Sequence, residues 1–183
     1  MFLKVFFLVV FIVGIHGFGY DDCNAYSDME AKAKCGADGY VLDYGLAYCH
    51  RFFTPEFYDN FDAEGKKWVQ CVGQCLIKAT QGIVDEQVNS GNIDCGAIKK
   101  EAFGKHVDCY VNCGFCDICA NNRLALFKVY NWADFTDPLA IQQIYDVIKK
   151  CGITACLWDK NEEFFKKVIK LEANNPPSTM ITL

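Results

Sequence analysis

Twelve cysteines in a chain of 183 residues constrain this sequence more than any other feature. An even number of cysteines is typical of exported chains, in which thiols oxidise in pairs. The cysteines lie at positions 23, 35, 49, 71, 75, 95, 109, 113, 116, 119, 151 and 156. We therefore expect six disulfides rather than a zinc site at Cys116 and Cys119, and no cofactor.

The first residues predict a secretory signal peptide. Lys4 precedes an apolar run over residues 5–15, and this run is shorter than the roughly 20 residues that a membrane-spanning helix needs. Small residues permit cleavage after Gly17 or Gly19. We expect a secreted, extracellular product without a membrane span.

Composition favours one well-buried domain after the leader. Hydrophobic residues make up 52% of the chain, and no long Pro, Gly or Ser linker interrupts it. The net charge of -5, with scattered basic residues, argues against a nucleic-acid partner. The expected organisation is a signal peptide over 1–19, a single helical disulfide-rich domain over 20–173, and a flexible tail over 174–183.

Apolar residues recur at helical spacing almost throughout, and runs of alternating β-branched residues are missing, so we predict an all-α fold. Four helices have clear start signals. They are 63–80 with Asp62 as cap, 92–113 with Asn92 or Asp94 as cap, 137–151 with Thr136 or Asp137 before Pro138, and 159–171 with Asp159 and Glu162. Residues 22–35 and 40–53 are weaker helical candidates.

The cysteine spacing in two predicted helices indicates how they pair. Cys71 and Cys75 are four positions apart, as are Cys109 and Cys113, so each pair lies on one helical face. In an antiparallel hairpin, Cys75 would face Cys109 and Cys71 would face Cys113, within the distance that a disulfide allows. The same argument permits Cys116 with Cys151 and Cys119 with Cys156 as one arrangement.

The central part of the chain resembles the stanniocalcins, a family of secreted, cysteine-rich helical hormones. Residues 61–69, FDAEGKKWV, are similar to that family's FDxxGKxxV helix start, and Cys75 is followed by Leu-Ile. Thirteen residues separate Cys95 from Cys109, and 34 separate Cys116 from Cys151, spacings that look the same as the family's. The resemblance covers roughly residues 49–151.

The resemblance implies a set of disulfides and a type of function. It implies Cys75 with Cys109, Cys116 with Cys151 and Cys35 with Cys95, which leaves Cys23 for Cys49. It also implies a role in calcium and phosphate handling, with a receptor or a protease as partner. The chain departs from the family because no cysteine follows Cys156 to link two chains, so we expect a monomer or a non-covalent dimer.

Candidate catalytic groups are scarce. His50 and His106 are the only histidines after the leader, and the sequence contains no GxSxG, HExxH or phosphate-binding glycine loop. His106 shares the cysteine-bearing face of its helix, so a packed histidine is expected rather than a metal ligand. We expect no enzyme activity.

Two groups of aromatic residues are candidates for binding. Residues 52–61 contain five aromatic residues, and residues 127–135 contain four. Core packing explains most of them, but exposed members would form an interaction patch, for which we select Phe57, Tyr58, Trp132 and Phe135. The leading hypothesis is a hormone-like regulator that binds another extracellular protein, and the alternative is a saposin-like lipid or hydrophobic-ligand binder or a toxin-like effector.

Overall fold

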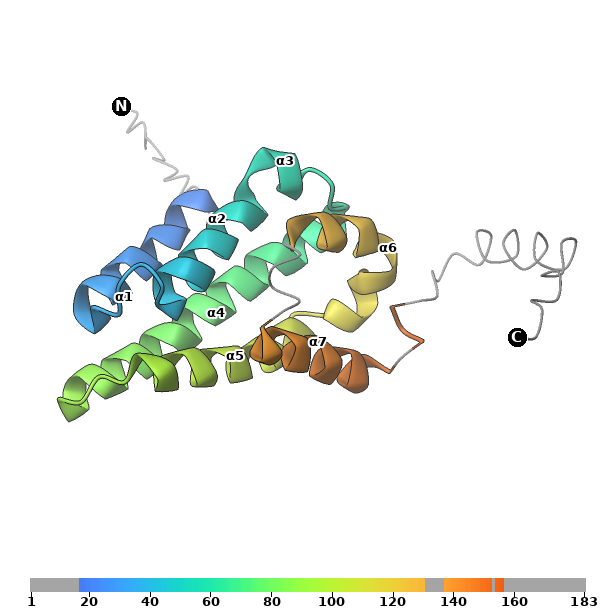
Figure 1. Cartoon of the computed structure of the whole chain (residues 1–183). Coiled ribbons are helices and arrows are strands. Elements are labelled where there is room, and N and C mark those ends of the chain that lie inside the picture. The colour runs from blue at the N-terminus through green and yellow to red at the C-terminus, as the bar shows by residue number, and fades with distance from the viewer. Residues whose placement is uncertain (1–16, 131–136, 153, 157–183) are drawn as a thin grey trace, which may run out of the picture.

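The computed structural model describes residues 17–130, 137–152 and 154–156, and within them the chain is all-helical without strands, as predicted (Figure 1). The expected signal peptide lies almost wholly outside these residues, as do the predicted helix 159–171 and the tail 174–183. The elements are a 3-10 helix η1 (Tyr20–Asn24), α1 (Ala25–Ala33), a π-helical segment η2 (Val41–Leu46), α2 (Ala47–Phe53), α3 (Pro55–Tyr58), α4 (Ala63–Ser90), α5 (Cys95–Asn112), α6 (Phe115–Val129) and α7 (Pro138–Cys151).

Helices α4 and α5 form the predicted antiparallel hairpin (Figure 1). The carboxylate of Asp62 accepts a hydrogen bond from the Gly65 amide at 2.7 Å and starts α4, while Asp94, rather than Asn92, caps α5 through the Ala97 amide at 3.0 Å. Helix α4 continues ten residues beyond the predicted end at 80, because its buried face continues and no stop signal precedes Gly91.

Helix α6 was not predicted from the sequence. It begins after Gly114, which has no side chain to cap the helix, so the usual start signal is missing. Most of its apolar residues are buried against other helices, and tertiary packing therefore stabilises it in place of a cap. The start of α7 was predicted correctly: Asp137 accepts a hydrogen bond from the Leu139 amide at 2.8 Å, with Pro138 in the first turn.

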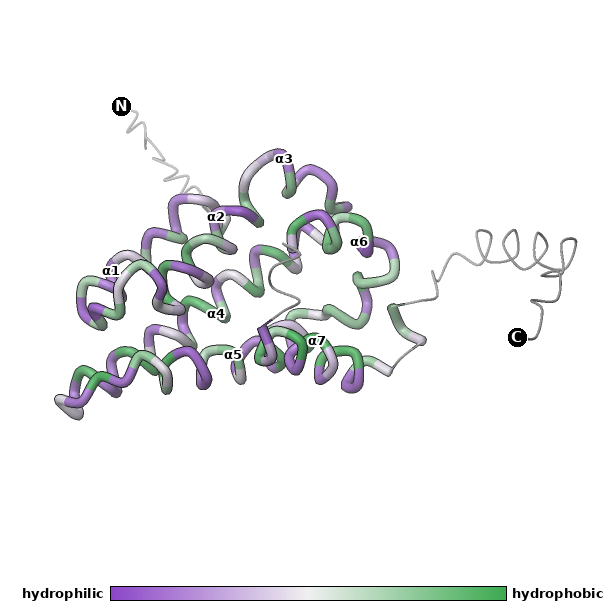
Figure 2. The backbone as a smooth tube through the Cα atoms, in the orientation of Figure 1, coloured by the Kyte–Doolittle hydropathy of each residue, from purple (hydrophilic) through white to green (hydrophobic). Residues whose placement is uncertain are grey.

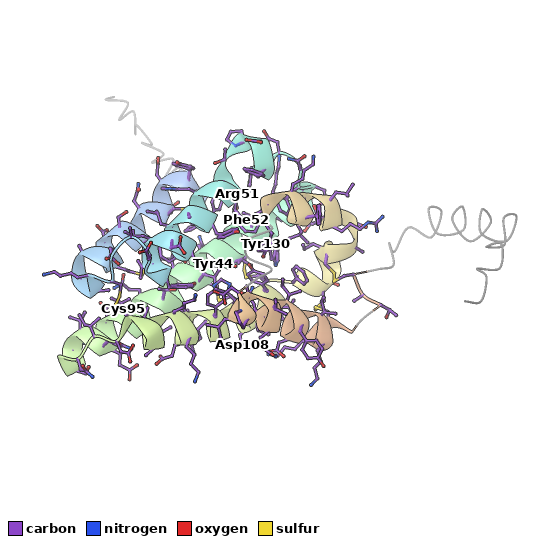
Figure 3. The ribbon with its side chains drawn as sticks, viewed as in Figure 1. Tyr44, Arg51, Phe52, Cys95, Asp108 and Tyr130 are labelled. Atoms are coloured by element: carbon purple, nitrogen blue, oxygen red, sulfur yellow. A yellow bond between two sulfur atoms is a disulfide. The ribbon has the colours of Figure 1, made fainter. Side chains whose placement is uncertain are left out.

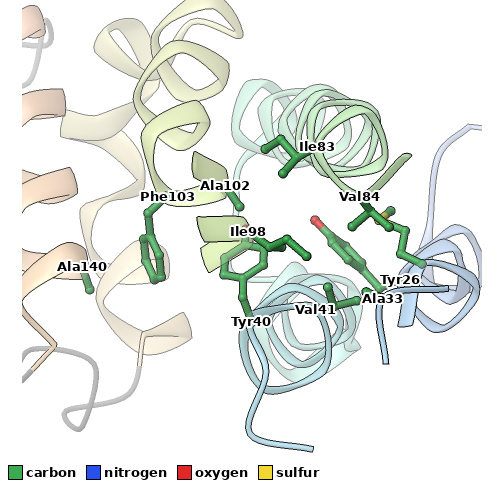
Figure 4. Close-up of a cluster of buried hydrophobic side chains, with 11 residues drawn as sticks. Tyr26, Ala33, Tyr40, Val41, Ile83, Val84, Ile98, Ala102, Phe103 and Ala140 are labelled. Carbon is green, nitrogen blue, oxygen red and sulfur yellow. The ribbon is translucent and has the colours of Figure 1, made fainter. Parts of the chain in front are cut away.

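Two buried clusters form the interior. One lies where α1 and η2 cross α4 and α5, and contains Tyr26, Tyr40, Ile83 and Phe103 (Figure 4). The other surrounds Trp68 and joins α4, α5, α6 and α7. Hydrophobic and hydrophilic residues both occur along the long helices (Figure 2), and α4, α5, α6 and α7 each bury some of their residues and expose others.

Six disulfides cross-link these elements, and no cysteine is free. Their Cα–Cα distances lie between 5.0 and 5.7 Å. The pairs are Cys23–Cys49, Cys35–Cys95, Cys71–Cys113, Cys75–Cys109, Cys116–Cys151 and Cys119–Cys156. The central hairpin therefore carries the two bridges that its antiparallel geometry requires.

Candidate functional site

The FDxxGKxxV motif at residues 61–69 connects helix α4 to helix α6. Asp62 caps α4, and its amide donates a hydrogen bond to the Asn122 side chain of α6 at 2.9 Å. Asn122 in turn donates to the Asp62 carboxylate at 3.0 Å and to the Ile118 carbonyl at 3.1 Å. Gly65 faces Asn122 so closely that a Cβ there would lie 2.5 Å from the amide oxygen. The motif thus positions α6 on α4, and its residues act in packing.

Aromatic rings fill the space between α2, α4, α5 and α6. The Trp68 indole N–H donates to the Tyr110 carbonyl at 3.3 Å, and the Trp68 ring lies 5.2 Å from that of Tyr110. The ring of Phe52 from α2 lies 6.1 Å from the ring of Trp68 and 6.1 Å from that of Tyr130. Phe52 and Tyr130 are labelled in Figure 3. Aromatic pairs at such distances stabilise a core beyond their buried area. Of the aromatic residues at 52–61, Phe61 is buried and the other four are partly buried against the cluster around Trp68.

His106 lies inside this aromatic region. Its side chain is 3% exposed, its Nε2 atom lies 2.7 Å from the Tyr40 hydroxyl, and its Nδ1 atom has no hydrogen-bond partner among the described residues. Burial lowers the pKa of His106 from 6.5 to about 3, so the ring is neutral at physiological pH. The prediction of a packed histidine is confirmed.

A cavity of about 40 Å³ adjoins His106 and is lined mainly by tyrosine and phenylalanine rings, including those of Tyr44 and Tyr48. A cavity of this volume accommodates a few water molecules at most. It is too small for an acyl chain.

A larger cleft of about 830 Å³ opens on the other side of Tyr44 and Tyr48. Its two basic side chains already have partners within the protein: Arg51 lies 4.4 Å above the Phe57 ring, and Lys99 forms an ion pair with Asp137 at 2.7 Å. The hydrogen bond from Lys99 is the main reason that the pKa of Asp137 is lowered. The Lys99–Asp137 pair joins α5 to the start of α7, and the Arg51–Phe57 contact joins α2 to α3, so we assign these charged residues a structural role.

An apolar groove of about 330 Å³ lies between α6 and α7. Helix α7 packs on α5 while α6 packs on α4, and the Cys116–Cys151 and Cys119–Cys156 disulfides tie the first turn of α6 to the end of α7 and the residues after it. The walls of this α6/α7 groove include Leu126, Phe127 and Tyr130 on one side and Ile144, Val147 and Ile148 on the other.

Exposed apolar residues accompany the groove. Among the described residues, seven large apolar side chains are exposed, and four of them lie on these two helices. They are Leu124 at 73%, Phe127 at 57%, Ile141 at 48% and Tyr145 at 58%. We name these four residues the α6/α7 surface. The sequence did not predict this surface because α6 lacks a start signal, so its residues could not be assigned to a helical face.

The structure describes only two of the four residues of the interaction patch predicted from the sequence. Phe57 and Tyr58 are described, and both are half-buried: Phe57 lies beneath Arg51, while the Tyr58 hydroxyl accepts a hydrogen bond from Gln70 at 3.1 Å. Trp132 and Phe135 lie outside the described residues. The four residues are therefore not brought together in the part of the chain that the structure describes.

No group of three or more histidine, cysteine or acidic side chains suited to a metal ion occurs within residues 17–130, 137–152 and 154–156. None of the helices described for this chain has the length and apolarity needed to cross a membrane. Comparison with family models, with curated proteins and with solved structures finds no match. The geometry itself defines the class: an all-helical protein cross-linked by six disulfides, of the kind that forms in an oxidising compartment.

Proposed function

We propose that the chain is a secreted, hormone-like, non-enzymatic regulator of the stanniocalcin-like kind, and that it acts by binding another extracellular protein. The α6/α7 surface is the observation that carries the proposal. Exposed aromatic and aliphatic side chains on a rigid support are typical of protein-binding surfaces, and here two disulfides hold the supporting helices together.

The disulfide pattern adds support. Cys75–Cys109, Cys116–Cys151 and Cys35–Cys95 are the pairs that the resemblance implies. The resemblance extends the proposal to calcium and phosphate handling, with a receptor or a protease as partner. The FDxxGK motif supports the shared architecture rather than a shared binding site, because its residues are used to join α4 to α6.

The test uses the full chain as bait in extracellular fluid from its source. We compare the wild type with a Leu124→Asp/Tyr145→Asp variant, in which both substituted residues are exposed. The matched control is Val88→Asp/Ile93→Asp, which places the same charges on apolar residues that are 37% and 39% exposed at the far end of the hairpin. A partner that is retained by the wild type and the control, is lost with the first variant, and binds again after purification supports the proposal.

The proposal fails if every captured protein is retained equally by both variants. The alternative of a lipid binder has less structural support, because the internal cavity of about 40 Å³ cannot hold an acyl chain. Leakage of dye-loaded liposomes on addition of the protein would favour that alternative.

A further inference from the structure

Among the described residues, no segment fills the α6/α7 groove between its apolar walls. The last described residue, Cys156, lies at this groove. Cys156 lines the groove, and its disulfide to Cys119 fixes the backbone there. A further 27 residues follow Cys156 in the sequence. Whatever follows Cys156 therefore starts beside an apolar surface.

The sequence after Cys156 has the pattern of an apolar-faced helix. Asp159 and Glu162 form a helix-start signal, and Phe164, Phe165, Val168, Ile169 and Leu171 recur at helical spacing. Lys166, Lys167 and Lys170 fall between them on the opposite face. Such a helix needs an apolar partner to bury one side.

We propose that residues 159–171 dock as an amphipathic helix in the α6/α7 groove of the same chain, with Phe164, Phe165 and Val168 against its apolar walls. A helix of 13 residues is about 20 Å long, and α7, with 14 residues, is about 21 Å long. Only two residues separate Cys156 from Asp159, so the helix begins within about 11 Å of the groove's end. Length and starting point both fit.

The tether favours this segment over a second copy of the chain. A segment linked through a short connection has an effective concentration on the order of millimolar at the groove. A second copy would have to supply the same contacts from dilute solution.

Docking of the segment has a consequence for other ligands. A helix from a partner protein could enter the groove only by displacing residues 159–171. Leu124, Ile141 and Tyr145 do not line the groove, so they remain available to a partner while the segment is docked. The inference concerns the free protein and does not depend on the identity of a partner.

Photo-crosslinking within the full chain tests the proposal. Phe127→benzoylphenylalanine replaces one aromatic residue of the groove wall with a photoreactive one of related shape. After irradiation and tryptic digestion, we expect the cross-link in peptides 161–166 or 168–170 of the same chain. The control, Val88→benzoylphenylalanine, lies near the end of α4 and should give no cross-link to these peptides.

Two further variants test the face of the segment in the Phe127→benzoylphenylalanine background. Phe164→Asp/Phe165→Asp should reduce the cross-link yield at least fivefold, whereas Lys166→Asp/Lys167→Asp should leave it within twofold, because the lysines fall on the opposite face. A cross-linked product of double mass would assign the groove to a second copy and overturn the proposal. A cross-link elsewhere in the chain, no cross-link, or equal yields from the two variants would also overturn it. These outcomes need no partner, so they leave the proposed function untouched.

Discussion

At the scale of single residues, the burial of His106 beside Tyr40 makes stability depend on pH. The two residues are 66 positions apart, and their side chains meet at 2.7 Å inside the protein. The neutral histidine is stabilised in the folded state because burial disfavours its charged form. Unfolding exposes the ring to water and returns its pKa to its ordinary value.

We predict that His106→Gln makes the protein less sensitive to acid. The pKa of His106 is about 3 in the folded state and 6.5 when unfolded, so the unfolded state binds the proton first as the pH falls. The folded state therefore loses stability between pH 6.5 and 3, by up to about 1.4 kcal/mol per pH unit. Urea denaturation of the wild type and the variant between pH 7 and 4 measures this difference.

Glutamine does not titrate, so the free energy of unfolding of the variant should decline less over this range. The control is Tyr40→Phe, which removes the hydroxyl partner but keeps the histidine. It should lower stability and retain the steep pH dependence. Parallel pH curves for the wild type and His106→Gln would contradict the prediction.

Phe18 discriminates between the two cleavage sites that the sequence permits. Its ring packs edge-on to Phe53 at 5.3 Å, and a Cβ at Gly73 would overlap it, so the ring lies directly on the surface of α4. Cleavage after Gly19 would remove this contact, whereas cleavage after Gly17 keeps it. We predict that the mature protein begins at Phe18, which N-terminal sequencing will show; a start at Tyr20 would contradict this.

At the scale of helices, the joint between α4 and α6 depends on a glycine. We predict that Gly65→Ala lowers the free energy of unfolding by about 1–2 kcal/mol, because the added Cβ overlaps Asn122, which three hydrogen bonds hold in place. Thermal denaturation followed by circular dichroism measures the change.

Gly82→Ala in the same helix is the matched control. Gly82 is exposed, and a Cβ there would meet nothing within 4 Å. Alanine should therefore raise stability by about 0.5–1 kcal/mol through its higher helix propensity. If Gly65→Ala also raised the free energy of unfolding, Asn122 would have moved aside without loss of stability, which would contradict the prediction.

The two bridges of the central hairpin are partly redundant. While Cys75–Cys109 is intact, Cys71–Cys113 closes only a short additional loop, so we predict that Cys71→Ala/Cys113→Ala costs about 2–3 kcal/mol. Replacing all four cysteines by alanine also removes Cys75–Cys109, whose cysteines are 34 positions apart. This variant should lose about 6 kcal/mol of its free energy of unfolding. Urea denaturation followed by circular dichroism compares the variants, and unfolding of the first variant in the absence of urea would contradict this redundancy.

At the scale of the whole molecule, the bridges join every region that the structure describes. Cys23–Cys49 and Cys35–Cys95 hold the N-terminal helices, the hairpin carries two bridges, and the last two hold α6 and α7. All twelve cysteines are paired within one chain. No thiol is left to link two chains covalently.

We predict that the intact mass of the native protein is twelve hydrogens below that of its reduced form. Alkylation without prior reduction should leave the mass unchanged, because no thiol is free. A denaturing gel without reductant should show a single chain. Two or more alkylated cysteines, or a reducible band of double mass, would contradict the prediction.

Local signals in the sequence were sufficient for much of this architecture. Asp62, Asp94 and Asp137 mark helix starts because each carboxylate accepts hydrogen bonds from amides within its own first turn. The hairpin bridges followed from cysteines four residues apart, since that spacing places both sulfurs on one face. Information of this kind is contained within a few consecutive residues.

Only the tertiary structure decided which residues face water. Helix α6 has no cap and depends on contacts with α4, so neither the helix nor the exposure of Leu124 could be inferred from neighbouring residues. Phe57 and Tyr58 proved half-buried, because Arg51 and Gln70 pack on them. Burial depends on segments distant in sequence, and hydrophobic packing carries no directional signal that the local sequence could record.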